Sequence, residues 1–178
     1  INISKMKLVL NYVYPYKYED CIISILSKGK SNNEIATLEA KLMDDLEAFN
    51  SYSESFDSIK NKIYSNIYRY VEKGKKVAIY GSGHFASMFI NTFGIDHLIK
   101  YIIDDDPDKN ELQMPGNHLP IYSSDKLFTG EIDICLMAMS HTNEEKVIQN
   151  NKRFLNSGGQ FISISPMSNN SIYQQKSL

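Results

Sequence analysis

The pattern of apolar and polar positions divides the chain near residue 76. From there to residue 166, short and continuously apolar runs alternate with segments in which apolar residues recur at helical spacing. The apolar runs read "VAIYG", "LIKYIIDDD", "DICLMAMS" and "QFISISP". Short apolar strands that alternate with helices are typical of a parallel sheet covered on both faces. The pattern therefore predicts an α/β domain over residues 76–166, with a small parallel sheet flanked by helices.

Residues 1–75 show a different pattern. "KLVLNYVY" (residues 7–14) is rich in β-branched and aromatic residues and is followed by Pro15, which predicts one strand. We expect a short helix near residues 20–27. Two apolar stripes at helical spacing then predict two amphipathic helices joined by the polar "NSYSES". The stripes are Ile35, Leu38, Leu42, Leu46 and Phe49, and Phe56, Ile59, Ile63, Ile67 and Val71, with a C-terminal cap at Gly74.

These patterns divide the chain into three parts. Residues 1–75 form an N-terminal strand and helical extension that packs on the α/β domain of residues 76–166, and residues 167–178 form a polar tail that we expect to be frayed. The two helices of the extension form either a hairpin or a long connector against a neighbouring domain. The first residue is Ile1 and not Met. We therefore expect a fragment of a longer protein, or a chain that lacks its first residues.

Composition narrows the classes of function. The chain has 178 residues, 42% hydrophobic and 22% charged, and a formal net charge of −2. Nucleic acids and acidic membranes are bound by concentrated basic faces, so neither is an expected partner. No run approaches the roughly 20 apolar residues of a membrane span, and no secretory signal is recognisable, which favours the cytoplasm. Cys21 and Cys135 form neither a metal spacing nor a disulfide framework.

Candidate chemistry lies in the turn after the first strand of the α/β domain. It reads G-x-G-x-x-A, with Gly81, Gly83 and Ala86, and it contains Ser82 and His84. The glycines permit a tight turn and a close approach to the backbone. The N–H groups at the start of the following helix favour a phosphate or a carboxylate. This turn makes the predicted domain Rossmann-like.

An acidic residue follows at the end of the second strand. Asp104 comes about twenty residues after the glycines, where Rossmann-type sites place an acid that holds ribose hydroxyls. In the alternative interpretation the glycines serve only the turn, and "DDDP" is a solvated acidic loop.

Three histidines fall in loops predicted at the same edge of the sheet. His84, His118 and His141 could bind a metal or transfer protons, but their spacing carries no metal signature and no metal is predicted. Histidines at loop starts are usually surface donors. The chain shows no nucleophile elbow, P-loop lysine or paired zinc cysteines, so the catalytic residues stay unknown. The predicted substrate-binding residues are Gly81, Ser82, Gly83, His84, Asp104, His118 and His141.

Several short motifs together resemble a known family. The matching positions are Gly81, Asp104, Pro107, Lys109, Pro115, Gly116, His118, Pro120, Ile121, Gly158, Gly159 and Phe161. They follow a Gly-rich turn, an aspartate followed by P-x-K, a PG-x-x-(I/L)-PI segment and a closing GG-x-F strand. Over roughly residues 70–166 this pattern resembles the C-terminal Rossmann-like domain of S-adenosylmethionine-dependent sugar C-methyltransferases.

The resemblance implies a role and partners. In that family a zinc-binding domain and a central methyltransferase domain come first; the central domain holds the methyl donor and the catalytic base, and the C-terminal domain helps to hold the nucleotide-sugar substrate. The chain would then be the substrate-side domain of a transferase, not catalytic alone. Its partners would be a nucleotide sugar and the upstream methyltransferase domain. S-adenosylmethionine would serve the full-length protein, with no cofactor bound by this domain.

Two departures from the family pattern concern the substrate. Where the family usually continues its first loop with a lysine-glycine pair, this chain has Phe85 to Ser87, so an expected phosphate-contacting cation is missing. Where the family often has Pro-Trp-Asn after the fourth strand, this chain has Met139, Ser140 and His141.

Two other functions stay open. One is a dinucleotide- or S-adenosylmethionine-binding Rossmann domain, although the α/β part has only about ninety residues, half of a full dinucleotide fold. A methyl-donor site also needs an acidic residue just before the glycines, where this chain has Tyr80. The other is a non-catalytic interaction scaffold, in which the helices between Glu34 and Val71 dock a partner.

Overall fold

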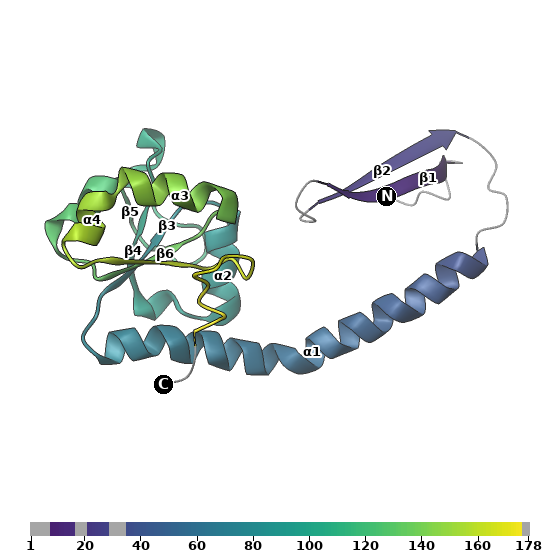
Figure 1. The fold of residues 1–178 in the computed structure, drawn as a ribbon, viewed down its shortest axis with the longest axis horizontal. Helices are drawn as coiled ribbons and strands as arrows, with labels where there is room; N and C mark the ends of the chain where they lie inside the picture. Colours follow the sequence, from purple (N-terminus) through teal and green to yellow (C-terminus); the bar gives the residue numbers. More distant parts are fainter. Residues whose placement is uncertain (1–7, 17–20, 29–34, 176–178) are drawn as a thin grey trace. The chain divides into compact units, whose positions relative to one another are not determined.

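The computed structural model describes residues 8–16, 21–28 and 35–175 (Figure 1), with side chains over residues 25–28 and 45–175. The chain divides into two compact units, Ile1–Glu54 and Ser55–Leu178. Each unit is described by itself.

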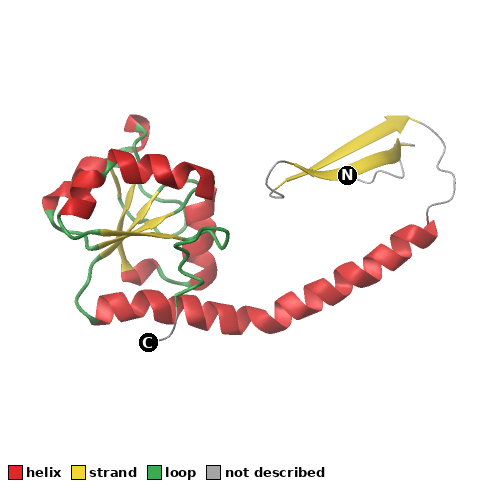
Figure 2. Ribbon diagram, viewed as in Figure 1, coloured by secondary structure: helices red, strands yellow, loops and turns green. Residues whose placement is uncertain are grey.

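A five-stranded parallel sheet forms the centre of the C-terminal unit (Figure 2). Its strands are β3 (Val77–Tyr80), β4 (Ile99–Ile103), β5 (Ile121–Tyr122), β6 (Ile134–Met137) and β7 (Gln160–Ser163), in the order β5-β4-β3-β6-β7. Every residue of β3 and β6 is buried, as expected at the centre of a sheet covered on both faces. The strand order reverses between β3 and β6. The predicted α/β, Rossmann-like fold is therefore confirmed.

Helices cover both faces of this sheet (Figure 1). The C-terminal part of α1 (Ile35–Glu72) and α2 (His84–Phe93) lie on one face, and α3 (His141–Asn150) and α4 (Lys152–Asn156) lie on the other. Three short 3₁₀ turns complete the unit: η2 (Asp96–Leu98), η3 (Pro107–Lys109) and η4 (Ser124–Thr129).

Two hydrophobic clusters fill the space between the sheet and its helices. On one face, Ile63 and Ile67 of α1 pack with Ile90 of α2 against the sheet. On the other face, Phe154 of α4 packs with residues of β3, β6 and β7. Cys135 is fully buried in the second cluster, and burial raises the pKa of its thiol. It is therefore an uncharged core residue, as the apolar residues around it in the sequence indicate.

The helical extension is one helix and not two. α1 runs without a break over 38 residues, through the "NSYSES" segment where we predicted a loop. Ser and Asn weaken a helix by less than about 0.7 kcal/mol each, and α1 contains no Gly or Pro that would end it. It ends where predicted, before Gly74, whose φ of 75° suits a left-handed cap. In the described parts of the chain no helix is both long and apolar enough to cross a bilayer.

The short helix predicted near residues 20–27 is wrong. These residues belong to a second strand, β2 (Cys21–Lys28), which pairs antiparallel with β1 (Leu8–Tyr16). The β-branched run Ile22, Ile23 and Ile25 favours a strand, and a partner strand is available directly before it. The strand predicted over residues 7–14 is present as β1, although residue 7 lies outside the described residues.

We predicted a frayed tail over residues 167–178, but residues 167–175 pack on the domain, and residues 176–178 lie outside the described residues. Ser168, Ser171 and Ile172 are buried, and Ile172 joins the cluster under α1 and α2. The tail also follows the outer edge of β7, since the N–H of Ser163 donates to the carbonyl of Asn170 at 2.9 Å and the N–H of Ile172 donates to that of Ser163 at 2.8 Å. A few isolated apolar residues in a polar segment were too weak a signal to predict this packing.

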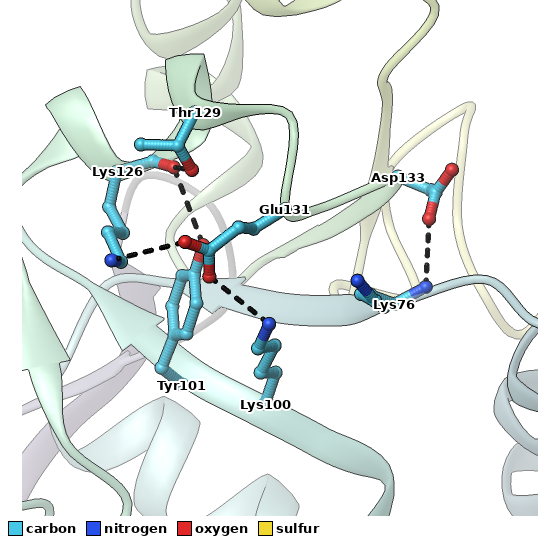
Figure 3. A network of polar contacts seen from close by, with 7 residues as sticks. All are labelled: Lys76, Lys100, Tyr101, Lys126, Thr129, Glu131 and Asp133. Carbon is cyan, nitrogen blue, oxygen red and sulfur yellow. Dashed lines mark hydrogen bonds and ion pairs between the residues drawn. The ribbon is translucent and has the colours of Figure 1, made fainter.

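Ion pairs fasten the amino-terminal edge of the sheet (Figure 3). Glu131 pairs with Lys100 at 3.1 Å and with Lys126 at 3.4 Å, and Asp133 accepts the N–H of Lys76 at 2.9 Å. These contacts hold the pKa values of Glu131 and Asp133 below their ordinary range. Exposed pairs of this kind add little stability, but they fix the loop before β6 against β3 and β4. This edge lies opposite the predicted site.

We expect Phe154→Ala to lower the free energy of unfolding by about 3–5 kcal/mol, because the side chain is 1% exposed and its removal leaves a cavity. Its ring also packs edge-on against Phe161, with ring centroids 5.1 Å apart. Urea unfolding followed by circular dichroism measures the change. The control is Met88→Ala on α2, where the side chain is 64% exposed and a change within about 0.5 kcal/mol is expected. Equal losses in the two variants would contradict the described core.

Candidate functional site

The loops after β3 and β6 touch at the point where the strand order reverses. Gly81 directly follows β3 with a φ of 101°, and a Cβ atom at this position would lie 2.8 Å from the carbonyl oxygen of Ala138, which follows β6. Only glycine fits this close approach. In open parallel sheets ligands bind beyond the carboxyl ends of the strands at such a switch point. The glycine turn predicted from the sequence therefore lies at the expected place.

The backbone is open at the second glycine of the turn. Gly83 precedes α2 and has a φ of −77°, an ordinary value for any residue, and a Cβ atom there would meet nothing within 4 Å. The first N–H groups of a helix have no acceptor within the helix, and no side chain caps α2. α3 also begins without a side-chain cap, at Ser140 beyond the end of β6. The positive ends of two ten-residue helices therefore lie at the carboxyl edge of neighbouring strands.

Asp104 is turned toward the glycine turn. Its Oδ2 atom accepts hydrogen bonds from the N–H of Ser82 at 2.8 Å and from its hydroxyl at 2.5 Å, and its Oδ1 atom accepts the N–H of Asp106 at 3.0 Å. Burial of the carboxyl raises its pKa, but the hydrogen bonds outweigh burial and hold the pKa of Asp104 below its ordinary value. Asp104 thus fixes the shape of the turn. Its predicted role as an acceptor for a ligand stays a prediction.

A lysine that we did not include among the site residues lies in the same corner. The Nζ atom of Lys109 is 3.2 Å from Oδ2 of Asp104 and 3.8 Å from Asp106. η3 explains this placement, because the Asp106 side chain accepts the N–H of Asp108 and Pro107 begins the turn, which returns Lys109 toward Asp104. The spacing D-x-x-P-x-K, from Asp104 to Lys109, could have predicted this placement of the lysine from the sequence. A cation thus reaches the turn from η3, although the turn itself lacks one.

Asp105 faces a different partner. It accepts a hydrogen bond from the hydroxyl of Tyr80 at 2.5 Å, and Asn151 donates to the same hydroxyl at 3.3 Å. Burial, and next the bond to Asp105, raises the pKa of Tyr80, so the tyrosine stays uncharged. Four aspartates, residues 104, 105, 106 and 108, therefore make the rim beyond β4 acidic.

The predicted histidines lie at three different places in the C-terminal unit. His84 and His141 are the first residues of α2 and α3. His118, with a φ of 57°, lies in a loop that leans on α2, where Ser87 donates to the carbonyl of Pro115 at 3.4 Å. Within the described residues, no group of three or more His, Cys, Asp or Glu side chains could hold a metal ion.

Glu144, in the first turn of α3, is a further polar residue that the sequence did not reveal. Its side chain is buried, and its two oxygens accept hydrogen bonds from the hydroxyl of Ser163 and, at 2.6 Å, from that of Ser168. Ser163 ends β7, so this carboxylate ties the loop after β7 to the start of α3. A buried carboxylate is normally hydrogen-bonded in this way.

Comparison with known families decides the assignment. The family described as "C-methyltransferase C-terminal domain" matches residues 27–166, which is most of the chain. The chain belongs to this family. The resemblance predicted from the motifs is therefore confirmed, and the matched range also includes α1.

Other comparisons concern the fold of this C-methyltransferase C-terminal domain. It is similar to the crystal structure of UDP-D-quinovosamine 4-dehydrogenase from Vibrio fischeri, with 22% identity, a TM-score of 0.39, and coverage of 57% of this chain and 91% of that one. At this level of identity the likeness says nothing of the substrate. No curated protein matches the chain.

We expect Asp104→Asn to lower the free energy of unfolding of the domain by about 1–3 kcal/mol at neutral pH, because the charged hydrogen bonds to Ser82 and Lys109 are lost. The folded-state pKa of Asp104 lies below its ordinary value of 3.8. Its stabilising effect is therefore present above that value and is lost as the pH falls through the folded pKa. The gap between wild type and variant should narrow below about pH 4 in urea unfolding curves.

The control for this prediction is Asp96→Asn. Asp96 is about half exposed, and its ion pair with His97 is 3.9 Å long, so we expect almost no gap at any pH. A gap for Asp104→Asn that stayed constant on acidification would show that its charge does not hold the turn.

Proposed function

We propose that the chain is the substrate-side domain of an S-adenosylmethionine-dependent sugar C-methyltransferase and that it binds a nucleotide sugar at the carboxyl edge of β3 and β6. The observation that carries this proposal is the open backbone at Gly83, directly before an uncapped helix. Such a position presents N–H groups and the positive end of a helix dipole, which together favour a phosphate.

The charges around the site suit the two ends of such a ligand. The starts of α2 and α3 are positive and favour the diphosphate. The rim beyond β4 is acidic and would repel phosphate, but carboxylates accept hydrogen bonds from hydroxyl groups. A ligand with a diphosphate at the helices and ribose or sugar hydroxyls near Asp105 and Asp106 satisfies both ends. Membership of the C-methyltransferase C-terminal domain family supports the methyltransferase part of this proposal.

The methyl donor is assigned to another part of the protein. A donor site of this fold needs an acidic residue just before the glycines, and that position holds Tyr80, which is 4% exposed and hydrogen-bonded to Asp105. A transferred methyl group also needs a base beside the acceptor carbon. We therefore propose that the isolated chain binds its ligand and does not catalyse, and that donor and base come from an upstream methyltransferase domain.

Gly83→Val tests the site. We expect the wild-type chain to release or take up heat on titration with UDP-glucose or dTDP-glucose, and the variant to bind roughly tenfold or more weakly, about 1.4 kcal/mol. This φ is unstrained for valine and its Cβ atom would meet nothing within 4 Å, so we expect the fold to be kept. The side chain would then fill the space through which we propose that a phosphate approaches the backbone. Thermal unfolding confirms that the variant is folded.

The matched control is Thr92→Val, which places the same side chain at an exposed position near the other end of α2. It should leave the affinity unchanged. NADH and S-adenosylmethionine are titrated in parallel, because stronger binding of either would favour a dinucleotide or methyl-donor site. An absence of heat with both nucleotide sugars would overturn the proposal and leave the scaffold interpretation.

A further inference from the structure

The aspartates that follow β4 differ in how much of each carboxylate is left for a ligand. In Asp104, Oδ2 accepts the N–H and the hydroxyl of Ser82 and lies 3.2 Å from the Nζ atom of Lys109. Its Oδ1 atom accepts the N–H of Asp106. A carboxylate offers about four acceptor positions, so a ligand hydroxyl has to compete at Asp104 with contacts that shape the glycine turn.

Two other aspartates of the rim are also poor acceptors for a ligand. The Asp106 carboxylate accepts the N–H of Asp108 at 3.1 Å at the start of η3, and it lies 3.8 Å from the Nζ atom of Lys109. Asp108 is exposed, and within the described part of the chain no contact fixes its side chain. A ligand would therefore have to order this side chain on binding, which costs conformational entropy.

Asp105 is exposed, yet one of its carboxylate oxygens is held in place. The hydroxyl of Tyr80 donates to Oδ2 at 2.5 Å, whereas Oδ1 has no partner among the described residues. Tyr80 is 4% exposed, and its ring packs edge-on against Phe161 with ring centroids 6.4 Å apart. Asp105 therefore combines a free acceptor atom with an orientation that is set before any ligand arrives, and such preorganisation lowers the cost of binding.

A buried amide directs the Tyr80 hydroxyl toward Asp105. Asn151, which is 2% exposed at the junction of α3 and α4, donates through Nδ2 to the carbonyl of Val147 at 2.9 Å and to the Tyr80 hydroxyl at 3.3 Å. Because the hydroxyl accepts from Asn151, its own proton is left to donate to Asp105. Burial raises the pKa of Tyr80, so this proton is kept. The network thus connects the core to one exposed carboxylate.

Asp105 borders the glycine turn through the pairing of β3 with β4. Tyr80 is paired with Ile103, and the N–H of Gly81 donates to the carbonyl of Ile103 at 2.7 Å. Asp105 follows two residues after Ile103, at the same edge of the sheet as the open backbone at Gly83. A carboxylate repels phosphate and accepts hydrogen bonds from hydroxyl groups, so it suits a part of the ligand away from the diphosphate.

We infer that Asp105, and not Asp104, accepts a hydroxyl group of the bound nucleotide sugar, and that Tyr80 is the residue that positions it. The hydroxyl belongs to the ribose or to the sugar, and it donates to Oδ1 of Asp105. This inference deepens the proposed function and rests on it.

Titration calorimetry with UDP-glucose, dTDP-glucose, UDP and dTDP tests the inference. Tyr80→Phe keeps the ring and the charge of the site, and it should weaken nucleotide-sugar binding about three- to tenfold. Asp105→Asn, at an exposed position, should also bind more weakly than the wild type. Added to Asp105→Asn, Tyr80→Phe should change the affinity no further, because it acts through Asp105. A loss that extends to UDP or dTDP assigns the hydroxyl to the ribose, and a loss with the nucleotide sugars alone assigns it to the sugar.

The matched control is Tyr101→Phe. Tyr101 is 2% exposed on β4, and its hydroxyl donates to the carbonyl of Lys126 at 3.4 Å, so the same change should leave the affinity as it is. Thermal unfolding checks that each variant is folded. If the wild type binds neither nucleotide sugar, the proposed function falls and this inference with it. If the wild type binds and Asp105→Asn binds as tightly, or if Tyr80→Phe has no effect or the same effect in both backgrounds, this inference alone is overturned.

Discussion

The carbonyl oxygen of Ala138 occupies the place that a side chain at residue 81 would need, and the candidate site depends on this contact. It brings the turns after β3 and β6 together at the switch point of the sheet. Asp104 then fixes the turn from the other side, through the N–H and hydroxyl of Ser82. Because both constraints act on Gly81 and Ser82, Gly83 is left as the exposed position before α2. A ligand that approaches α2 meets backbone whose shape is already set, so little conformational entropy remains to be lost on binding.

The α/β part of the fold was predictable from the sequence because its strands are short, apolar and regularly spaced. The N-terminal part was not, and each error has a physical cause. α1 passes through "NSYSES" because polar residues without Gly or Pro weaken a helix only slightly. β2 was taken for a helix because a short apolar run gives no clear period, and its pairing with β1 decides the structure.

The site was predictable where it depends on local sequence. Gly81, Ser82, Gly83 and Asp104 come together because a Rossmann-like turn always brings such positions together. Lys109 was missed as a site residue because its place depends on the geometry of η3. Glu144 was missed because its partners, Ser163 and Ser168, are 19 and 24 residues away. Contacts of this length are set by packing and leave no periodic trace in the sequence.

The buried carboxylate of Glu144 also bears on where the domain ends. The family match stops at residue 166, yet Ser168 supplies one of the two hydroxyls that solvate Glu144, and Ile172 fills the cluster beneath α1 and α2. A truncation at residue 166 would remove a hydrogen-bond donor from the buried carboxyl group of Glu144 and would leave a void where Ile172 packs. The packed domain therefore extends past the residues that match the family, and deletions in this stretch remove core residues.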